Sequence, residues 1–358
     1  MREIEVVAPN IKRNQTGVTS TIIAAVGAQA RLRPVRALGL GLPDSLPQLR
    51  WRDLLRGWSR PPGLSHRIWH ARRPDEMAVG LILRDVLRQP WKLVFTSHDA
   101  HDHPKLYRWM AARMDALVAS TPASARAIDT RAHVIGHGVD AQAFQPAPDR
   151  AAEWRALGLP GAYGLGTFGR LRPQKGQDVL VRALCETLPR HPEAGYVIAG
   201  LTTPAHRDFE TALRLQLSAA GIADRVTFLG EVDAAMIRRL YAAVSLYIQP
   251  GRSEGYGLTP IEAMASGTAA ISTRVGAAAD MVIEGVTGHL VDVEDWQAMA
   301  ARLDERLSDM AGTLAMGVAG RAHVLANHTA EIEARRLFAV YDSLVPRGGL
   351  QPAPNTPE

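Results

Sequence analysis

The sequence has one cysteine in 358 residues, an aromatic content of only 6%, and no long apolar run. A single cysteine excludes an internal disulfide and a thiolate metal cluster, and Cys185 lies in a helix-like segment where a free thiol is a small packing residue. No apolar stretch approaches the roughly 20 residues that span a bilayer. The N-terminus enters a strand-like run rather than a charged and then apolar leader, so we expect a cytoplasmic chain.

Negative charge is scarce in the first half of the chain. Residues 1–150 carry 22 Lys and Arg against 13 Asp and Glu, whereas the remaining residues carry 19 against 23. Ten arginines lie between Arg31 and Arg73, accompanied only by Asp44 and Asp53. This excess favours an anionic membrane surface or a phosphorylated acceptor, and the alternative is a solvated basic face.

One basic segment carries two tryptophans at helical spacing. Residues 50–60, RWRDLLRGWSR, interleave four arginines with Trp51, Leu54, Leu55 and Trp58, which predicts a basic amphipathic helix. Its indole rings either dip into a membrane interface or pack into the core.

Short apolar runs alternate with amphipathic segments along most of the chain. In the second half, strands are predicted at 162–168, 195–199, 225–229, 245–249 and 268–272, with helices between them. In the first half, strands are predicted at 4–8, 67–70, 93–97, 116–119 and 133–135. Repeated βα units with short connections predict parallel sheets covered by helices on both faces, which is a Rossmann-like arrangement.

The same pattern predicts two domains, at residues 1–148 and 153–328. The segment 146–152, PAPDRAA, is interpreted as the linker between them. A C-terminal helix at 329–345 is expected to pack back toward the first domain, and the Pro- and Gly-rich tail at 346–358 is predicted to be disordered.

The most specific segment is 253–267, SEGYGLTPIEAMASG. It places Glu254 and Glu262 eight positions apart across a turn that enters a helix. Gly255 and Gly257 allow a tight turn and close approach to a ligand, and Pro260 is well tolerated in a first helical turn. The helix N-terminus that results suits an anion such as a diphosphate.

A structural alternative exists for the second glutamate. Thr259-Pro260-Ile261-Glu262 fits a capping box, in which the glutamate side chain reaches back to the threonine backbone. Nothing in the local sequence requires an acid at Glu254, which precedes the helix.

Together with FGRLRPQKG at 168–176, the E-x7-E pattern resembles glycosyltransferase family 4 over nearly the whole chain. The resemblance implies an α/β GT-B fold with two facing Rossmann-like domains and a central donor cleft. It also implies a retaining reaction, contact of Glu254 with the transferred hexose, and contact of Glu262 with the donor ribose. Arg170 and Lys175 would neutralise the diphosphate, so no metal and no cofactor are expected.

Further donor and reaction residues follow from the resemblance. The expected catalytic residues are His98, Glu254, Arg170 and Lys175. The expected donor-binding residues are Gly17, Arg170, Lys175, Val232, Glu254, Gly255, Tyr256, Gly257, Leu258, Thr259 and Glu262. Gly17 corresponds to the family's phosphate-facing glycine loop, which here has one glycine instead of two. Val232 corresponds to the main-chain segment with which the family binds the nucleobase. His98-Asp99 corresponds to the family's His-Asp at a strand end.

Two short segments leave alternatives open. TSHDAHDH at 96–103 also fits a metal site built from His98, His101 and His103, or a polar loop. HGVDAQAF at 137–144 resembles the family's N-G-V-D segment, with His137 in place of the usual asparagine.

Three N-terminal segments resemble bacterial lipopolysaccharide core mannosyltransferases: VVAPNIKRNQTGVTSTI, LGLGLPDSLPQLRWRDL and IWHARRPDEM. This implies GDP-mannose as the donor and a lipopolysaccharide core or related anionic glycolipid as the acceptor. It also implies peripheral contact of the basic N-terminal domain with the cytoplasmic face of the inner membrane, and no nucleic acid partner. The alternatives are a nucleotide-sugar 2-epimerase of the same fold and an inert donor-binding or membrane-docking subunit.

Overall fold

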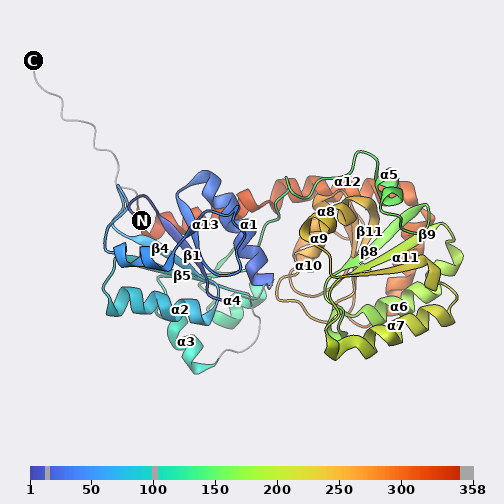
Figure 1. Cartoon of the computed structure of the whole chain (residues 1–358), viewed down its shortest axis with the longest axis horizontal. Coiled ribbons are helices and arrows are strands. Elements are labelled where there is room, and N and C mark those ends of the chain that lie inside the picture. The colour runs from blue at the N-terminus through green and yellow to red at the C-terminus, as the bar shows by residue number, and fades with distance from the viewer. Residues whose placement is uncertain (13–16, 99–103, 347–358) are drawn as a thin grey trace, which may run out of the picture. The chain divides into compact units, whose positions relative to one another are not determined.

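The computed structural model describes residues 1–12, 17–98 and 104–346. The chain divides into two compact units, each built on its own sheet (Figure 1). Unit 1 comprises Met1–His137 together with Ala330–Glu358, and unit 2 comprises Gly138–Thr329.

Unit 1 contains a parallel sheet in the order β3-β2-β1-β4-β5-β6-β7. The strands are β1 (Val6–Asn10), β2 (Val35–Gly39), β3 (Gln48–Leu49), β4 (Arg67–Ala71), β5 (Trp91–Ser97), β6 (Ala116–Ala119) and β7 (His133–Val134). The central strands β1, β4 and β5 are buried along almost their whole length, as expected for a parallel sheet covered on both faces.

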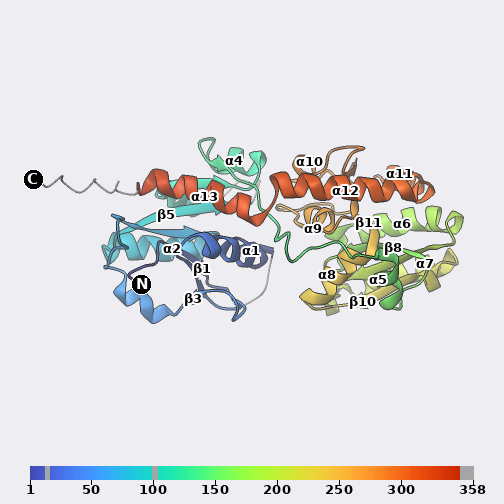
Figure 2. The ribbon, with the colours of Figure 1, turned by 90° about the horizontal axis from the view of Figure 1, so that it is seen from above.

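Helices cover both faces of this sheet. Apolar residues of α1 (Gly17–Leu32) and α13 (Ala330–Leu344) pack on one face, and the two helices lie side by side (Figure 2). The other face packs against η1 (Trp51–Arg56), α2 (Pro74–Leu81), η2 (Ile82–Val86) and α3 (Lys105–Ala111), while α4 (Pro122–Ile128) covers the end of β6.

Unit 2 contains a parallel sheet in the order β10-β9-β8-β11-β12-β13. The strands are β8 (Tyr163–Phe168), β9 (Ala194–Ala199), β10 (Val226–Gly230), β11 (Val244–Gln249), β12 (Ala269–Thr273) and β13 (Gly288–Val291). The strand order reverses between β8 and β11. In open α/β sheets, such a switch point leaves a crevice at the carboxyl ends of the strands, where ligands bind.

The helices of unit 2 also form two layers. One face packs against α6 (Gln177–Thr187), α7 (Arg207–Ala219), α11 (Trp296–Ser308) and α12 (Met310–Asn327). The other packs against α5 (Arg150–Ala156), α8 (Ala234–Ala243) and α9 (Thr259–Ala265), with α10 (Ala278–Met281) beside α9. Cys185 is partly buried on α6, where it packs against the first of these layers.

The predicted linker at 146–152 is wrong. Asp149 caps α5 by accepting a hydrogen bond from the Ala152 amide, so this segment opens a helix of unit 2. The division falls instead between His137 and Gly138, because Val139 pairs with Thr329 in unit 2. Helix α13 belongs to the core of unit 1. The predicted disordered tail lies outside the described residues from position 347 onward.

The predicted amphipathic helix at 50–60 is also wrong. The segment forms only a short 3-10 helix, and Gly57 then ends it. Leu54 alone is buried among its four apolar residues, and Trp51, Leu55 and Trp58 are exposed. The indole rings therefore do not pack into the core.

Candidate active site

The carboxyl ends of β8 and β11 enclose a small pocket in unit 2. Residues of β8 and β11 and the residues that follow each strand line it, together with residues of two nearby turns: Thr167, Phe168, Gly169, Tyr247, Gln249, Pro250, Gly251, Lys175, Gln177, Glu254 and Thr259. This is the switch point of the sheet. The two most specific sequence motifs therefore meet where the topology predicts a ligand.

Lys175 and Glu254 form an ion pair in this pocket. The Nζ atom of Lys175 lies 2.5 Å from Oε1 of Glu254, with side-chain exposures of 26% and 15%. Lys175 ends the 3-10 helix η3 (Pro173–Lys175), and Gly176 follows at φ 66°, where a Cβ would lie 1.9 Å from the Pro250 carbonyl oxygen. Only glycine fits there, so the backbone holds Lys175 against the end of β11.

The turn that carries Glu254 is formed by residues 253–258. Gly257 adopts φ 85° and requires glycine, whereas Gly255 is not in the left-handed region, so only one of the two predicted glycines makes the turn possible. Tyr256 is buried in a hydrophobic cluster that includes Met264 and Met281, and Leu258 packs partly buried against the same cluster. Thr259 starts α9 and lines the pocket.

Glu262 lies one turn into α9. Tyr241 on α8 donates a hydrogen bond of 2.9 Å from its hydroxyl to Oε2 of Glu262. The residue keeps partial solvent exposure, but protein atoms enclose its carboxyl group, and this burial raises the pKa of Glu262 to about 7, against a smaller lowering effect of the Tyr241 hydrogen bond. The capping-box alternative is wrong, because the N-cap is Leu258 and makes no side-chain cap bond.

Arg170 and Val232 lie near the pocket rather than in its described lining. Arg170 follows β8 with an exposed side chain, and Gln177 holds its backbone by donating to the Arg170 carbonyl oxygen at 3.0 Å. Val232 follows β10 and packs partly buried against the cluster that contains Phe168 and Tyr241. Their donor contacts stay predictions.

Tyr241 and Gln249 were not predicted. Gln249 ends β11, lines the pocket, and accepts a hydrogen bond of 2.6 Å from Ser272 through its side-chain oxygen. Tyr241 occupies a helix position whose pattern predicts a buried core residue. Its hydroxyl reaches Glu262 because α8 packs against α9. Neither residue has a local sequence signal.

In unit 1, His98 lies at the carboxyl end of β5, where the sequence predicts it. His98 Nδ1 lies 3.0 Å from His137 Nε2, and His137 Nδ1 lies 3.0 Å from Oε1 of Glu333 on α13. His137 thus links the Glu333 carboxylate on α13 to the imidazole of His98. Burial, reinforced by His137 and the nearby arginines, holds the pKa of His98 well below its usual value.

The remaining predicted residues of unit 1 are only partly placed. Gly17 is the first residue of α1, after the end of β1 and the undescribed residues 13–16. Asp99, His101 and His103 lie outside the described residues. Among the residues that the structure does describe, no group of three or more His, Cys, Asp and Glu side chains is arranged to hold a metal ion.

Comparison with known proteins places this geometry in a family. Residues 161–323 match the family described as glycosyl transferases group 1. The chain is 43% identical over 347 residues to the lipopolysaccharide core biosynthesis mannosyltransferase LpcC of Rhizobium leguminosarum bv. viciae, covering 96% of this chain and 98% of that protein. It is 41% identical over 349 residues to LpsB of Rhizobium meliloti, which bears the same description, covering 96% and 99%.

A solved structure supports the fold. Anabaena HepE, crystallised with UDP and glucose, superposes with a TM-score of 0.79 at 19% identity, covering 95% of this chain and all (100%) of that one. This likeness and the two parallel sheets agree with the predicted GT-B fold class. The chain is a glycosyltransferase and belongs to the group 1 family.

Proposed function

We propose that the chain is a retaining, metal-independent mannosyltransferase that uses GDP-mannose. Its acceptor is a lipopolysaccharide core or a related membrane glycolipid. The substrate classes are supported by the names of the two relatives, both mannosyltransferases of lipopolysaccharide core biosynthesis that match over nearly their whole length. The observation that carries the chemistry is the Lys175–Glu254 pair at the switch point of unit 2.

Lys175 supplies the charge that the leaving group needs. Departure of a nucleoside diphosphate leaves about two negative charges on the pyrophosphate, and a fixed ammonium in an enclosed pocket stabilises this charge as it develops. Lys175 is already oriented by Glu254 and by the rigid Gly176 turn. This arrangement performs the task that a bound divalent metal performs in other transferases.

Glu254 acts by positioning. Its carboxylate is bonded to Lys175, so it can hold the ammonium and accept from sugar hydroxyls at once. In the retaining mechanism proposed here, the acceptor hydroxyl attacks from the face that the diphosphate leaves. The leaving phosphate oxygen takes the proton, and no protein carboxylate becomes glycosylated.

The donor proposal predicts selective stabilisation by GDP. At 100 times its Kd, a ligand that binds only the folded state stabilises it by about 2.7 kcal/mol. We therefore expect GDP to raise the melting temperature by several degrees, more than UDP or ADP do at equal concentration. A larger shift with UDP would refute the GDP assignment while leaving the diphosphate site intact.

The same proposal predicts turnover in excess EDTA. Release of GDP from GDP-mannose should depend on added glycolipid acceptor and continue at an unchanged rate without divalent metal. Complete inhibition by EDTA, reversed by Mg²⁺ or Mn²⁺, would contradict metal independence. GDP release or sugar epimerisation without acceptor would favour the nucleotide-sugar 2-epimerase. Binding of GDP-mannose without any turnover would favour the inert donor-binding subunit.

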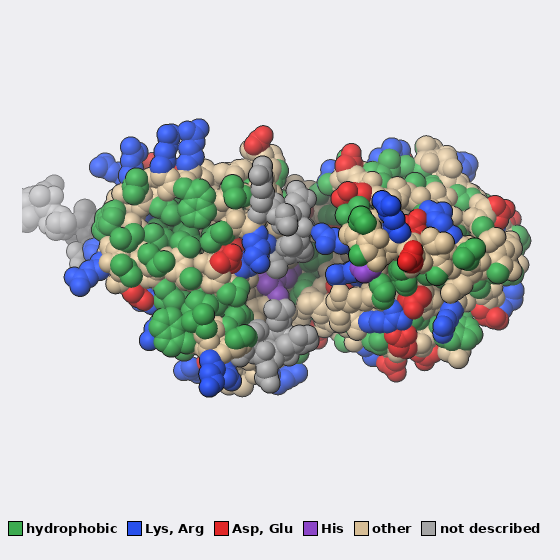
Figure 3. Space-filling model, turned by 60° about the horizontal axis from the view of Figure 1, so that its bottom comes forward, with side chains coloured by type: hydrophobic (Ala, Val, Ile, Leu, Met, Phe, Trp, Pro, Cys, Tyr) green, Lys and Arg blue, Asp and Glu red, His purple; other side chains and the backbone are tan. Residues whose placement is uncertain are grey.

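Unit 1 exposes an apolar surface suited to the membrane contact that we propose. Trp58, after η1, donates to the Leu87 carbonyl oxygen at 3.0 Å, which ties two exposed segments together. Trp58 is 52%, Val86 70% and Leu87 42% exposed. Figure 3 shows hydrophobic side chains spread over unit 1, with lysines and arginines at the margins. No helix among the described residues has the length and apolarity to cross a bilayer.

Two exposed valines provide a matched test of this surface. Val86 of unit 1 and Val318 on α12 of unit 2 are 70% and 69% exposed. We expect Val86→Ser to lower binding to vesicles containing anionic lipid about tenfold, since burying a valine side chain contributes roughly 1.5 kcal/mol. Val318→Ser should bind like the unmodified chain in vesicle sedimentation. Equal vesicle binding by both variants would show that Val86 does not contact the membrane.

A further inference from the structure

The guanidinium of Arg252, which follows β11, makes one hydrogen bond from Nε and two from each of its Nη atoms. Nη1 and Nη2 donate at 2.8 Å to the two carboxylate oxygens of Asp178 on α6. Nη1 also donates to the Pro173 carbonyl oxygen. Nε and Nη2 donate to the Glu294 carboxylate, Nη2 at 3.0 Å. A guanidinium has five N–H groups, so all of them have partners within unit 2 and none is left over for a direct contact with the donor.

Further bonds fasten the turn before α6 to the turn after β11. The Arg252 amide donates to the Gln174 carbonyl oxygen at 2.9 Å, and the Gln174 side chain donates to the Ser253 hydroxyl at 2.8 Å. Lys175 follows Gln174, and Glu254 follows Ser253. Arg252 therefore sets the spacing between the two residues whose ion pair lines the pocket.

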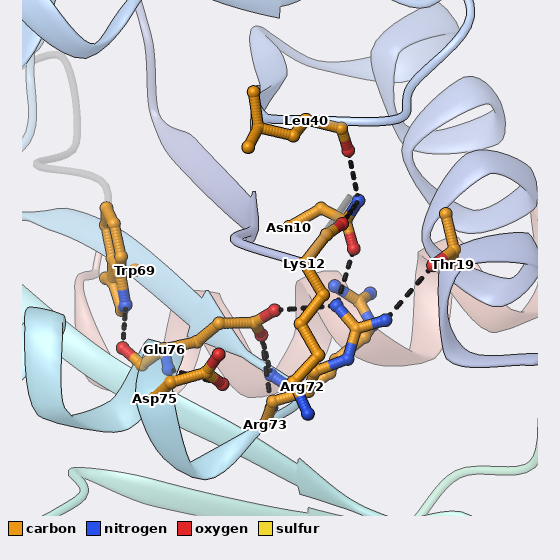
Figure 4. Close-up of polar contacts among 9 residues, drawn as sticks. All are labelled: Asn10, Lys12, Thr19, Leu40, Trp69, Arg72, Arg73, Asp75 and Glu76. Carbon is orange, nitrogen blue, oxygen red and sulfur yellow. Dashed lines mark hydrogen bonds and ion pairs between the residues drawn. The ribbon is translucent and has the colours of Figure 1, made fainter. Parts of the chain in front are cut away.

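Arg73 of unit 1 shows the contrasting case of an arginine inside a core. It donates to Asn10 at 2.5 Å, to Thr19 at 3.0 Å and to Glu76 at 3.1 Å (Figure 4). Its side chain is only 7% exposed, and breaking such a buried pair is strongly destabilising because it leaves a buried charge without a partner. The Arg252 side chain is 27% exposed, and pairs at this depth add little to stability. Stability alone therefore does not account for the contacts of Arg252.

The backbone of Glu294 gives independent support. Glu294 adopts φ 69°, in the left-handed region that is unfavourable for a residue with a Cβ. It lies between β13 and α11, and its carboxylate is bonded to Arg252. Strained residues persist where the surrounding contacts hold them, and they cluster at functional sites. Arg252 thus joins α6, the turn after β11 and this strained residue beside the pocket.

We propose that Arg252 is a positioning residue for glycosyl transfer. It holds the Lys175 ammonium and the Glu254 carboxylate at the spacing that the leaving diphosphate and the transferred sugar require. This inference rests on the proposed function, because the roles that it supports are those of Lys175 and Glu254. The shape of the arginine matters more than its charge, since a lysine ammonium cannot form the bidentate bond to Asp178 and also reach a second carboxylate.

Arg252→Met and Arg252→Lys test this role in steady-state release of GDP from GDP-mannose. The acceptor is truncated lipopolysaccharide extracted from cells that lack the chain. A misplacement of about 1 Å can lower a rate about 100-fold, so both variants should lower kcat by about tenfold to 100-fold. KM for GDP-mannose should change by less than about threefold, because the charge on the leaving group grows mainly in the transition state.

Arg190→Met is the matched control. Arg190 also bridges two acids of unit 2, Glu186 at 3.0 Å and Asp304 at 3.1 Å, and these residues are not among those that line the pocket. This variant should keep the full kcat. An equal loss of kcat in Arg190→Met and Arg252→Met would overturn the inference.

A double variant shows whether Arg252 acts through Lys175. Adding Arg252→Met to Lys175→Met should lower kcat by at most about threefold more, because the side chain to be positioned is gone. General damage to the fold would instead multiply the two losses. The inference is overturned if the losses multiply, or if Arg252→Lys keeps the full kcat. Full activity in Lys175→Met would refute the proposed function, whereas a loss there beside full activity in both Arg252 variants would refute this inference alone.

Glu294→Gly separates positioning from folding. Glycine adopts φ 69° without strain, so the melting temperature should not fall below that of the unmodified chain. The change removes both bonds between Glu294 and Arg252, so we expect kcat to fall several-fold. This variant carries the test if Arg252→Met fails to fold, and an unchanged kcat in it then overturns the inference.

Discussion

Replacing Lys175 with methionine is expected to lower kcat/KM about 100- to 1,000-fold. Removing one preorganised donor from a site of developing negative charge has an effect of this size in other enzymes. The loss should fall mainly on kcat, because the charge on the diphosphate grows as the bond to the sugar breaks. Steady-state GDP release at saturating donor and acceptor measures it.

The fold should survive this change. The Lys175–Glu254 pair is partly exposed, at 26% and 15%, and such pairs add little to stability. Arg214→Met is the matched control, since it breaks a surface pair with Glu210 at 2.8 Å in the same unit. Full activity in Lys175→Met, or an equal loss in Arg214→Met, would contradict the assignment.

The partner residue sharpens the test. Glu254→Gln should also lose activity, because the amide no longer holds the ammonium by charge. In the double variant the two losses should combine to less than their product, as expected for side chains that act as one unit. Losses that multiply would mean that Lys175 and Glu254 act independently.

Replacing Glu262 with glutamine is expected to weaken GDP binding and to stabilise the free protein at high pH. Charge-assisted hydrogen bonds from ribose hydroxyls contribute roughly 1.5–3 kcal/mol, so Kd for GDP should rise by about tenfold or more. The stability effect follows from the burial that raises the pKa of Glu262 to about 7 from 4.5.

The sign of this effect is fixed by proton binding. Between pH 4.5 and about 7 the folded chain holds a proton on Glu262 that the unfolded chain has released. The contribution of Glu262 to stability is therefore full below pH 4.5 and is lost as pH rises through 7. At about 1.4 kcal/mol per pKa unit, Glu262→Gln should gain on the order of 3 kcal/mol at pH 8 and nothing at pH 4.

Urea denaturation between pH 4 and 8 measures this difference. The exposed Glu186, whose side chain is 57% accessible and paired with Arg190, provides the control as Glu186→Gln. Its stability should track the unmodified chain at every pH. A Glu262→Gln curve parallel to that of the unmodified chain would show that the pKa of Glu262 is the same in the folded and unfolded chain, which would contradict the effect of burial.

Much of the fold could be predicted because the central strands are continuous apolar runs. The predicted strands at 162–168 and 245–249 differ from β8 and β11 by one residue at an end. Short or edge strands were missed, such as β3 with two residues and β13 with four, because too few side chains carry the pattern. The prediction of an amphipathic helix over 50–60 failed because the segment forms a 3-10 helix of six residues that ends at Gly57.

The candidate site was predictable where it is local in sequence. Glu254 and Glu262 share one motif, and Lys175 lies at a recognisable strand-to-helix turn. The Tyr241–Glu262 bond depends on which helices become neighbours, and sequence spacing does not encode this. The His137–Glu333 contact joins positions 196 residues apart. The boundary between the units, which follows His137, depends on such long-range contacts and could not be predicted from the local sequence.

A crystal structure of the chain with GDP tests the central claim most directly. We expect the diphosphate at the carboxyl ends of β8 and β11, within hydrogen-bond distance of Lys175 Nζ, and the ribose hydroxyls within hydrogen-bond distance of Glu262. A nucleotide bound elsewhere, with the Lys175–Glu254 pair intact and its pocket vacant, would contradict it.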